Sequence, residues 1–206
     1  MITILIILLT VAVSMMAWQN PYWFDKYSFR PDRVEKYREY YRFFTSTFLH
    51  STWTHLFFNL FTLFFFGPSV EGTFDLLTGG KGWLYLILLY VSAMVVSEAG
   101  TFFKYRNESR YSSIGASGAV SAVLFSSIWF SPANTILVMF IPMPGFAFGA
   151  IYLIYTAWAA KNDMSGQINH DAHFYGSVWG VLFTILVSPE SVGHFFDALA
   201  TFQMFG

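Results

Sequence analysis

Ser117 is the residue whose surroundings best suit nucleophilic chemistry. It lies within the segment from Gly115 to Gly118, at the start of an apolar stretch that runs to about Phe130. Small neighbours leave a hydroxyl accessible and let other backbone approach it closely. The same pattern of small residues also occurs as a plain packing motif between helices, so the serine suggests catalysis only if partners for it exist elsewhere in the chain.

Histidine is the side chain that could activate such a serine. His173 stands near the start of another apolar stretch, and a serine next to an imidazole base is an activated nucleophile. Asp171 is only two residues away from His173 and does not face it on a helix, which favours a Ser-His dyad over a Ser-His-Asp triad. His55 and Asn59 are four residues apart and share one helix face, where an imidazole and an amide could both donate to a developing oxyanion.

The composition places these groups in a membrane. Hydrophobic residues make up 55% of the 206 residues and charged residues only 11%, too little charge for the surface of a water-soluble domain. The net charge of -1 and the lack of a basic stripe exclude nucleic acid as a partner. The chain has no cysteine, which excludes disulfides, thiolate catalysis and thiolate metal sites.

Apolar runs predict an all-α membrane protein with six spans in one domain covering residues 1–206. A long interfacial loop at about 19–49, rich in aromatic and charged side chains, follows the first span, and a mildly amphipathic tail occupies about 189–206. We interpret the first run as a retained helix, because no basic residue precedes it and no small-x-small cleavage site ends it. The predicted spans are Ile2–Trp18, Thr52–Phe66 with an extension towards Val70, Gly82–Phe103, a span from the Ser117 region to Phe130, Thr135–Ala160, and Ala172–Val187.

The polar residues gather at three span starts that should lie together. In an alternating chain of six spans, the starts of the second, fourth and sixth lie on the same face of the membrane. These starts hold His50, His55 and Asn59, then Ser117, then His170, Asp171 and His173. Polar groups at such depth are costly unless they pair or line a watery cavity, so their convergence predicts an intramembrane site.

Small residues would bring two of these starts close together. Gly176 and Gly180 share one face of the last predicted span, and they could pack tightly against Gly118 and Ala122. Such packing would bring His173 to Ser117.

With these stretches in hand, the chain resembles a rhomboid intramembrane serine protease of the six-helix bacterial type. The matching residues are His50, His55-Leu56-x-x-Asn59, Glu71, Gly115-x-Ser117-Gly118, and Ala172-His173-x-x-Gly176-x-x-x-Gly180. They occur in the family's order and cover the central architecture of the chain.

The resemblance implies a role for each matching residue. Ser117 would be the nucleophile and His173 the general base, while His55, Asn59 and the backbone amide of Ser117 would form the oxyanion hole. Tyr41 and Arg42 stand where family members often have Trp-Arg and would anchor the first loop. Ser121 occupies a position where some members have a tyrosine that stacks on the catalytic histidine, and the sequence leaves open whether Tyr175 or Tyr111 supplies a ring instead.

The resemblance also implies a reaction and a location. The reaction would be hydrolysis of a peptide bond within or beside a transmembrane segment of a membrane-protein substrate, without a cofactor or metal. Cleavage of a spanning helix requires local unwinding, so small or helix-breaking residues near the cut should favour it. The location would be the bacterial plasma membrane, with the site towards the extracytoplasmic side.

The distribution of Lys and Arg predicts the opposite orientation of the chain in the membrane. The loops after the first, third and fifth spans hold ten of the eleven Lys and Arg residues, which by the positive-inside rule would put them in the cytoplasm. We follow the resemblance, because six of the ten lie in the long first loop, which also holds four acidic residues.

Two other function classes remain open. A metal-dependent membrane protein could use His50, His55, His170 and His173, although the sequence contains no His-Glu-x-x-His and no histidine pair at i and i+4. A catalytically silent relative could bind membrane clients without cleaving them, although both Ser117 and His173 are retained.

Prolines and glycines single out the fifth predicted span as a gate. Pro142, Pro144, Gly145 and Gly149 weaken its backbone, so we expect it to bend. Its upper half, with Tyr155 and Trp158, is predicted to lean on Phe58 and to separate from it when a substrate enters.

Overall fold

The computed structural model describes residues 1–138, 141–162 and 168–202, and most of them are helical. The long helices are α1 (Ile2–Gln19), α5 (Trp53–Thr78), α6 (Gly82–Tyr105), α7 (Ser117–Phe130), α8 (Gly145–Asn162) and α9 (His170–Val187). The first loop folds into α2 (Tyr22–Tyr27), α3 (Pro31–Tyr37), α4 (Arg42–Thr45) and the 3-10 helix η1 (Ser46–Phe48). Strands β1 (Thr135–Val138) and β2 (Ile141–Pro144) precede α8, and α10 (Ser191–Ala200) follows α9.

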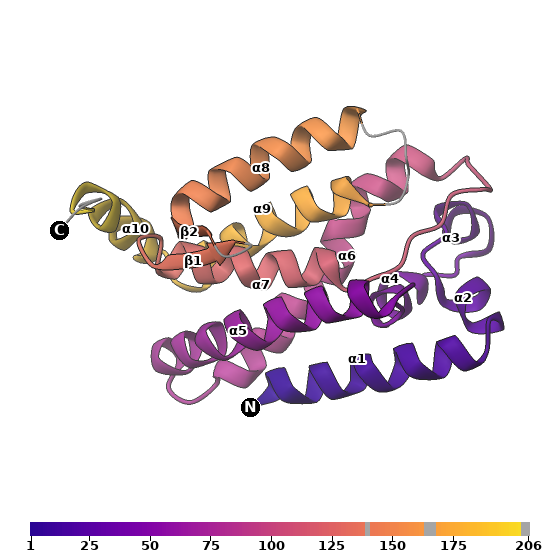
Figure 1. Ribbon diagram of the computed structural model, residues 1–206, viewed down its shortest axis with the longest axis horizontal. Helices are drawn as coiled ribbons and strands as arrows, with labels where there is room; N and C mark the ends of the chain where they lie inside the picture. Colours follow the sequence, from indigo (N-terminus) through magenta and orange to yellow (C-terminus); the bar gives the residue numbers. More distant parts are fainter. Residues whose placement is uncertain (139–140, 163–167, 203–206) are drawn as a thin grey trace.

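The long helices form a membrane-protein bundle with α7 at its centre. In Figure 1, α7 lies between α5 and α9, and it packs against α5, α6, α8 and α9. Three described helices, α1, α5 and α6, are long and apolar enough to cross a bilayer, and α9 with α10 makes a fourth if this pair, bent by 114°, counts as one span. The all-α, multi-pass class is therefore confirmed, while the count of six spans stays a prediction.

The starts of α5, α7 and α9 lie at the same end of the bundle, as predicted. Figure 1 shows these ends beside the helices of the first loop, with α10 and the β1–β2 hairpin at the other end. Helix α7 has only 14 residues, which at 1.5 Å per residue is about 21 Å, compared with a hydrocarbon core of about 30 Å. A helix this short places its first residue below the membrane surface if its other end lies at the opposite interface.

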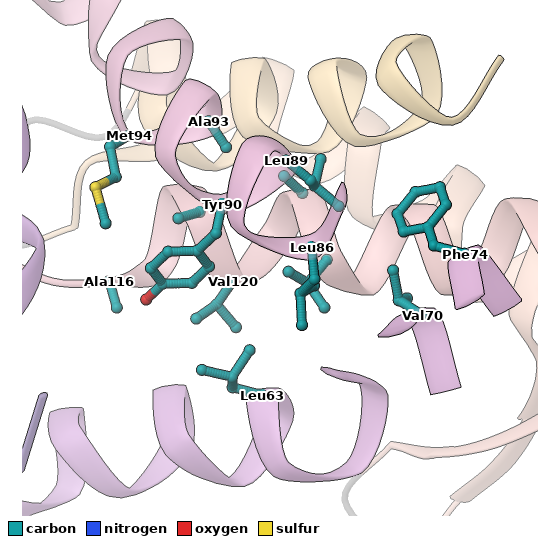
Figure 2. Close-up of a cluster of buried hydrophobic side chains, with 13 residues drawn as sticks. Leu63, Val70, Phe74, Leu86, Leu89, Tyr90, Ala93, Met94, Ala116 and Val120 are labelled. Atoms are coloured by element: carbon teal, nitrogen blue, oxygen red, sulfur yellow. The ribbon is translucent and has the colours of Figure 1, made fainter. Parts of the chain in front are cut away.

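A core of buried hydrophobic side chains holds α5, α6 and α7 together. Figure 2 shows Leu63 and Val70 of α5 facing Leu86 and Tyr90 of α6, with Val120 of α7 beside them. These side chains are at most 4% exposed. In a bilayer, where the lipid is as apolar as these side chains, their close van der Waals packing fixes the positions of the helix starts.

Glycines set the distance between α7 and α9. A Cβ atom on Gly176 would overlap the carbonyl oxygen of Gly118, and one on Gly180 would overlap the carbonyl oxygen of Ala122. The contact predicted from the spacing of these four residues is confirmed. It brings the backbones of the two helices together one turn beyond His173.

The predicted helix Thr135–Ala160 is wrong in its first third. Residues 135–144 contain an antiparallel hairpin in which Thr135 pairs with Pro144 and Val138 with Ile141, and the helix starts only at Gly145. The prolines explain the difference, because a ring at Pro142 and at Pro144 removes backbone donors that a helix needs. Residues 139–140 lie outside the described part of the chain.

Other boundaries shift by smaller amounts. The second predicted span continues through Pro68 to Thr78, where Gly79 ends it in a left-handed conformation, with φ of 63°. The sixth starts at His170 instead of Ala172, because the side chain of Asn169 caps it by accepting from the amide of Ala172 at 3.1 Å. Of the predicted tail, α10 is described and residues 203–206 are not.

Candidate active site

The four predicted catalytic side chains line one cavity. A hollow of about 850 Å³ is bordered by Ser117, His173, His55 and Asn59, which come from the starts of three different helices. The rest of its wall is mixed in character: Ser51, Thr52, Thr54, Phe58, Thr62, Val120, Ser121, Leu124, Phe148, Tyr152 and Ile168. The structure thus brings together the residues that the sequence places at separate helix starts.

Ser117 is the first residue of α7 and is half-buried. The loop before it takes an unusual conformation at Gly115, whose φ is 122°. A Cβ atom built on Gly115 would lie 2.6 Å from Nε2 of His55. Position 115 therefore requires glycine for two reasons. Only glycine readily adopts this backbone conformation, and a side chain here would prevent the imidazole of His55 from approaching the loop that leads to Ser117.

His173 lies in the first turn of α9, and its backbone amide donates to the carbonyl of Asn169 at 3.2 Å. Its ring lies near that of His170, with centroids 6.1 Å apart. Asp171 faces elsewhere, since its carboxylate accepts from Nζ of Lys104 at 2.9 Å. This pairing agrees with the expectation that Asp171 is not the third member of a triad.

Tyr152 of α8 supplies a ring beside His173. The two rings are nearly parallel, at 15°, with centroids 6.3 Å apart, and the Tyr152 hydroxyl lies 3.1 Å from Oγ of Ser121. The two tyrosines considered from the sequence lie elsewhere: Tyr175 packs on Gly100, and Tyr111 stacks on Tyr105 at 3.9 Å.

A weak signal for Tyr152 exists in the sequence. Tyr152 is three residues after Gly149, and residues at this spacing share a helix face. A Cβ atom built on Gly149 would lie at van der Waals distance from Phe125 and Ile128 of α7. A glycine that marks the contact face of α8 could thus have pointed to Tyr152.

The start of α5 is organised by local hydrogen bonds. Thr52 caps the helix by accepting from the amide of His55 at 3.1 Å, and Oγ of Ser51 lies 3.4 Å from Nδ1 of His55. A Ser51 hydroxyl that donates to Nδ1 places the imidazole hydrogen on Nε2, the atom near Gly115. Asn59 is buried, and one of its amide hydrogens is donated to the carbonyl of His55 at 3.0 Å.

His50 joins three segments in the interior. It is fully buried, and its Nε2 accepts from the amide of Ala116 at 3.4 Å. On its other side Nδ1 is 3.0 Å from Oγ of Ser14, which itself donates to the carbonyl of Phe48. Through these hydrogen bonds His50 connects Ser14 of α1 to Ala116, the residue that precedes Ser117.

Arg42 anchors the first loop through hydrogen bonds to several of its segments. It is 2% exposed, and its guanidinium donates to the carbonyls of Asp25 and Ser28 and to Glu39 at 2.6 Å. The neighbouring Tyr41 hydroxyl donates to the carbonyl of Lys26 at 3.3 Å.

Glu39 is held between two guanidinium groups. Arg33 donates to both of its oxygens, at 2.7 and 3.1 Å, and Arg42 donates to one. Hydrogen bonds from Arg33 and then from Arg42 lower the pKa of Glu39 from 4.5 to about 2. The carboxylate thus remains charged at all ordinary pH values and ties α3 to α4.

Glu71 lies far from the cavity, at the start of α1. Its carboxylate accepts from the amides of Ile2 and Thr3 at 2.9 and 3.3 Å, and from the Thr3 hydroxyl. An acidic side chain at a helix N-terminus satisfies free amides and complements the helix dipole. Glu71 therefore joins α5 to α1.

The aromatic contact expected at the gate differs from the one found. Tyr155 packs edge-on against His170 at 5.7 Å and also lies near Trp158, whereas the ring of Phe58 packs on Phe57. A pairing of Tyr155 or Trp158 with Phe58 is not among the ring contacts of the described residues. Residues 163–167, between α8 and α9, lie outside the described residues.

A second, more polar cavity adjoins the first. It measures about 600 Å³ and shares Ser51 and His55 with the larger one. Its other borders come from the first loop and from the loop before α7, including Asp25, Arg30 and Arg110. Within residues 1–138, 141–162 and 168–202, no group of three His, Asp or Glu side chains is arranged to hold a metal ion.

Comparison with known proteins gives a consistent result. Rhomboid-like protein 11, chloroplastic, from Arabidopsis thaliana is 34% identical over 164 residues, which cover 72% of this chain and 53% of that protein. RHOMBOID-like protein 12, mitochondrial, from the same plant is 32% identical and covers 65% of this chain and 42% of its own length. Rhomboid protein 1, mitochondrial, from Saccharomyces cerevisiae is 31% identical over 69% of this chain and 40% of that protein.

The chain spans about half the length or less of these relatives. The Rhomboid domain family matches residues 37–190, a range that contains every side chain brought together at the larger cavity. The chain therefore belongs to the rhomboid family.

Proposed function

We propose that the protein is an intramembrane serine endopeptidase. The observation that supports this most is that Ser117, His173, His55 and Asn59 border one cavity in a rhomboid-family membrane protein. Serine and histidine supply a nucleophile and a base, and the other two supply donors.

In the proposed reaction, His173 removes the proton from Oγ of Ser117 as the oxygen attacks the scissile carbonyl carbon. The carbonyl π electrons move to oxygen, and His55, Asn59 and the amide of Ser117 donate to that oxyanion. The intermediate collapses as the C–N bond breaks, and the imidazolium of His173 protonates the leaving amine. Water, activated by His173, then hydrolyses the acyl-enzyme and releases Ser117.

The cavity wall suits a substrate that arrives from lipid. Phe58, Leu124 and Phe148 offer an apolar surface, whereas Ser51 and Thr52 offer hydrogen bonds beside the donors. The end of a transmembrane helix needs both, because its side chains are apolar and its unwound backbone must be satisfied. We therefore propose membrane proteins as substrates, cleaved within or beside a transmembrane segment.

We further propose that α7, α8 and α9 cross the bilayer with α1, α5 and α6 to give six spans. The resemblance to the six-helix bacterial type favours the bacterial plasma membrane, with the cavity open to the extracytoplasmic side. The relatives named above are mitochondrial and chloroplastic proteins, so we propose to test the location with a reporter fused to the C-terminus, which should be active only on the cytoplasmic side.

The reaction class is tested with a fluorescent fluorophosphonate on the purified full chain. Wild type should be labelled in a time-dependent manner, Ser117→Ala should not be labelled at all, and His173→Ala should react at a small fraction of the wild-type rate. Asp171→Ala, which removes the partner of Lys104, should stay close to wild type. A folded wild-type protein that is not labelled would instead identify a silent relative that binds clients.

A further inference from the structure

We propose that Glu98 is a positioning residue that fixes the positions of the serine and the histidine of the dyad relative to each other. The proposal rests on the function proposed above. Glu98 lies in α6, outside the cavity wall, and is 8% exposed. A buried carboxylate in a spanning helix is costly unless it is well paired, so its partners are informative.

The carboxylate connects the two segments that lead into the dyad. One oxygen, Oε2, accepts from Nδ2 of Asn169 at 3.0 Å, and the other, Oε1, accepts from Oγ of Ser113 at 3.4 Å. Asn169 is four residues before His173, and Ser113 is four residues before Ser117. One side chain of α6 thus contacts the approach to both reacting groups.

Asn169 transmits its position directly to His173. Its Oδ1 caps α9 by accepting from the amide of Ala172 at 3.1 Å and also accepts from the hydroxyl of Thr101 at 3.0 Å. Its backbone carbonyl accepts from the amide of His173 at 3.2 Å. Because Oδ1 is committed to the cap, Nδ2 must face Glu98, and the amide requires an acceptor there.

Ser113 is equally well fixed on the serine side. Its backbone forms a bridge with Phe29 of the first loop, with hydrogen bonds of 2.9 and 3.0 Å in the two directions. Two residues further, the amide of Gly115 donates to the carbonyl of Ser46 at 3.0 Å. The bond from Ser113 to Glu98 therefore ties the loop that leads to Ser117 to the capping residue of α9.

Because Asn169 donates to Glu98, exchanging the amide and the carboxylate between these two positions should preserve the hydrogen bonds. In Glu98→Gln, the one remaining side-chain oxygen can accept from Asn169 while the new amide donates to the hydroxyl of Ser113, so both contacts persist as weaker, uncharged hydrogen bonds. In Asn169→Asp, two carboxylates face each other. In the double variant, the introduced glutamine can donate to the introduced aspartate and accept from Ser113, while that aspartate can accept from Ala172 and Thr101. All four bonds then return, with donor and acceptor exchanged between the two substituted side chains.

The experiment measures how fast a fluorophosphonate inactivates the purified full chain, separating the limiting rate from the half-saturating concentration. Asn169→Asp should lower the limiting rate by about 10- to 100-fold with little change in half-saturation, as expected for misplaced reacting groups. Glu98→Gln should lower it less. The double variant should return to within about twofold of wild type. Melting temperature in detergent confirms that each variant is folded at the assay temperature.

Ser92→Ala is the matched control. Ser92 also links α6 to α9, by accepting from Nε1 of Trp179 at 2.9 Å, but this pair lies away from the dyad, with Ser92 six residues before Glu98 and Trp179 six residues after His173. Its loss should lower the melting temperature and leave the inactivation rate unchanged. Equal slowing by Ser92→Ala, an Asn169→Asp variant that reacts like wild type, or a double variant that is not restored would each overturn the role of Glu98. If wild type itself does not react, the proposed function fails instead.

Discussion

The ring of Tyr152 lies nearly parallel to the imidazole of His173, although the two residues belong to different helices. The planes differ by 15°, the centroids are 6.3 Å apart, and the Tyr152 hydroxyl is 3.1 Å from Oγ of Ser121. A serine at position 121 leaves space on α7, and the ring that occupies this space comes from α8. The ring beside one face of the His173 imidazole, the proposed base, therefore comes from α8, the helix that follows the β1–β2 hairpin.

This relationship predicts an ordered effect of substitutions at Tyr152. Tyr152→Ala removes the ring contact, which is worth about 0.5–1.5 kcal/mol and corresponds to a two- to tenfold slower reaction of Ser117 with a fluorophosphonate. Tyr152→Phe keeps the ring and should be affected less. Ser121→Ala removes the other partner of the same hydrogen bond, so it should match Tyr152→Phe; a rate for Tyr152→Ala equal to wild type would show that the ring has no role.

The oxyanion donors should be separable from the dyad. Asn59→Ala or His55→Ala leaves the backbone amide of Ser117 in place, so each should slow peptide hydrolysis by about 10²–10³-fold at most. Both variants should still be labelled by a fluorophosphonate, unlike Ser117→Ala. Complete loss of labelling in a well-folded Asn59→Ala would assign Asn59 a structural role, consistent with its bond to the carbonyl of His55.

The two glycines of α9 should differ in their effects. In Gly176→Ala and in Gly180→Ala the new methyl group meets a backbone carbonyl of α7, which cannot move aside as a side chain could. Each should lower the free energy of unfolding by about 1–3 kcal/mol. Gly176 is one turn from His173, so Gly176→Ala should also slow labelling of Ser117, whereas Gly180→Ala should mainly lower the melting temperature.

The Arg33–Glu39–Arg42 group should make stability depend on acidity. The pKa of Glu39 is about 2 in the folded protein and 4.5 ordinarily, so the unfolded chain binds the proton more readily. The stabilisation is therefore complete above about pH 4.5 and is lost as the pH falls from there towards 2. Melting temperatures measured between pH 7 and pH 2 should show this loss.

Glu39→Gln should lower the melting temperature at pH 7 and flatten its fall in acid, because the titrating group is gone. Glu108→Gln, at an exposed position in the loop before α7, is the matched control and should leave both unchanged. Equal acid sensitivity of wild type and Glu39→Gln would assign the acid transition to other groups.

The sequence predicted those site residues that can be identified from their type and from their position near the start of a helix. Ser117, His55 and His173 each lie near a boundary between polar and apolar sequence, and alternation of spans places such boundaries together. The contact of Gly176 with Gly118 was predictable for a similar reason, since small residues four apart mark a helix face.

Contacts between distant segments were not predictable in this way. Tyr152 and Ser121 are 31 residues apart, and Glu98 and Asn169 are 71 apart, so no local period links them. The β1–β2 hairpin was missed because a short apolar run such as Thr135–Val138 suits a strand or a helix equally. Pro142 and Pro144 were interpreted as a bend within a helix, whereas they lie in strand β2, directly before α8.

The polar cavity that meets the larger one at Ser51 and His55 gives the proposed reaction a direction. An intact peptide bond is uncharged and can enter from the apolar side. Cleavage creates an ammonium and a carboxylate, whose transfer back into an apolar environment is costly. In the proposed reaction both new chain ends would therefore favour the polar cavity. In the proposed reaction, the charge created by hydrolysis at this boundary would oppose religation.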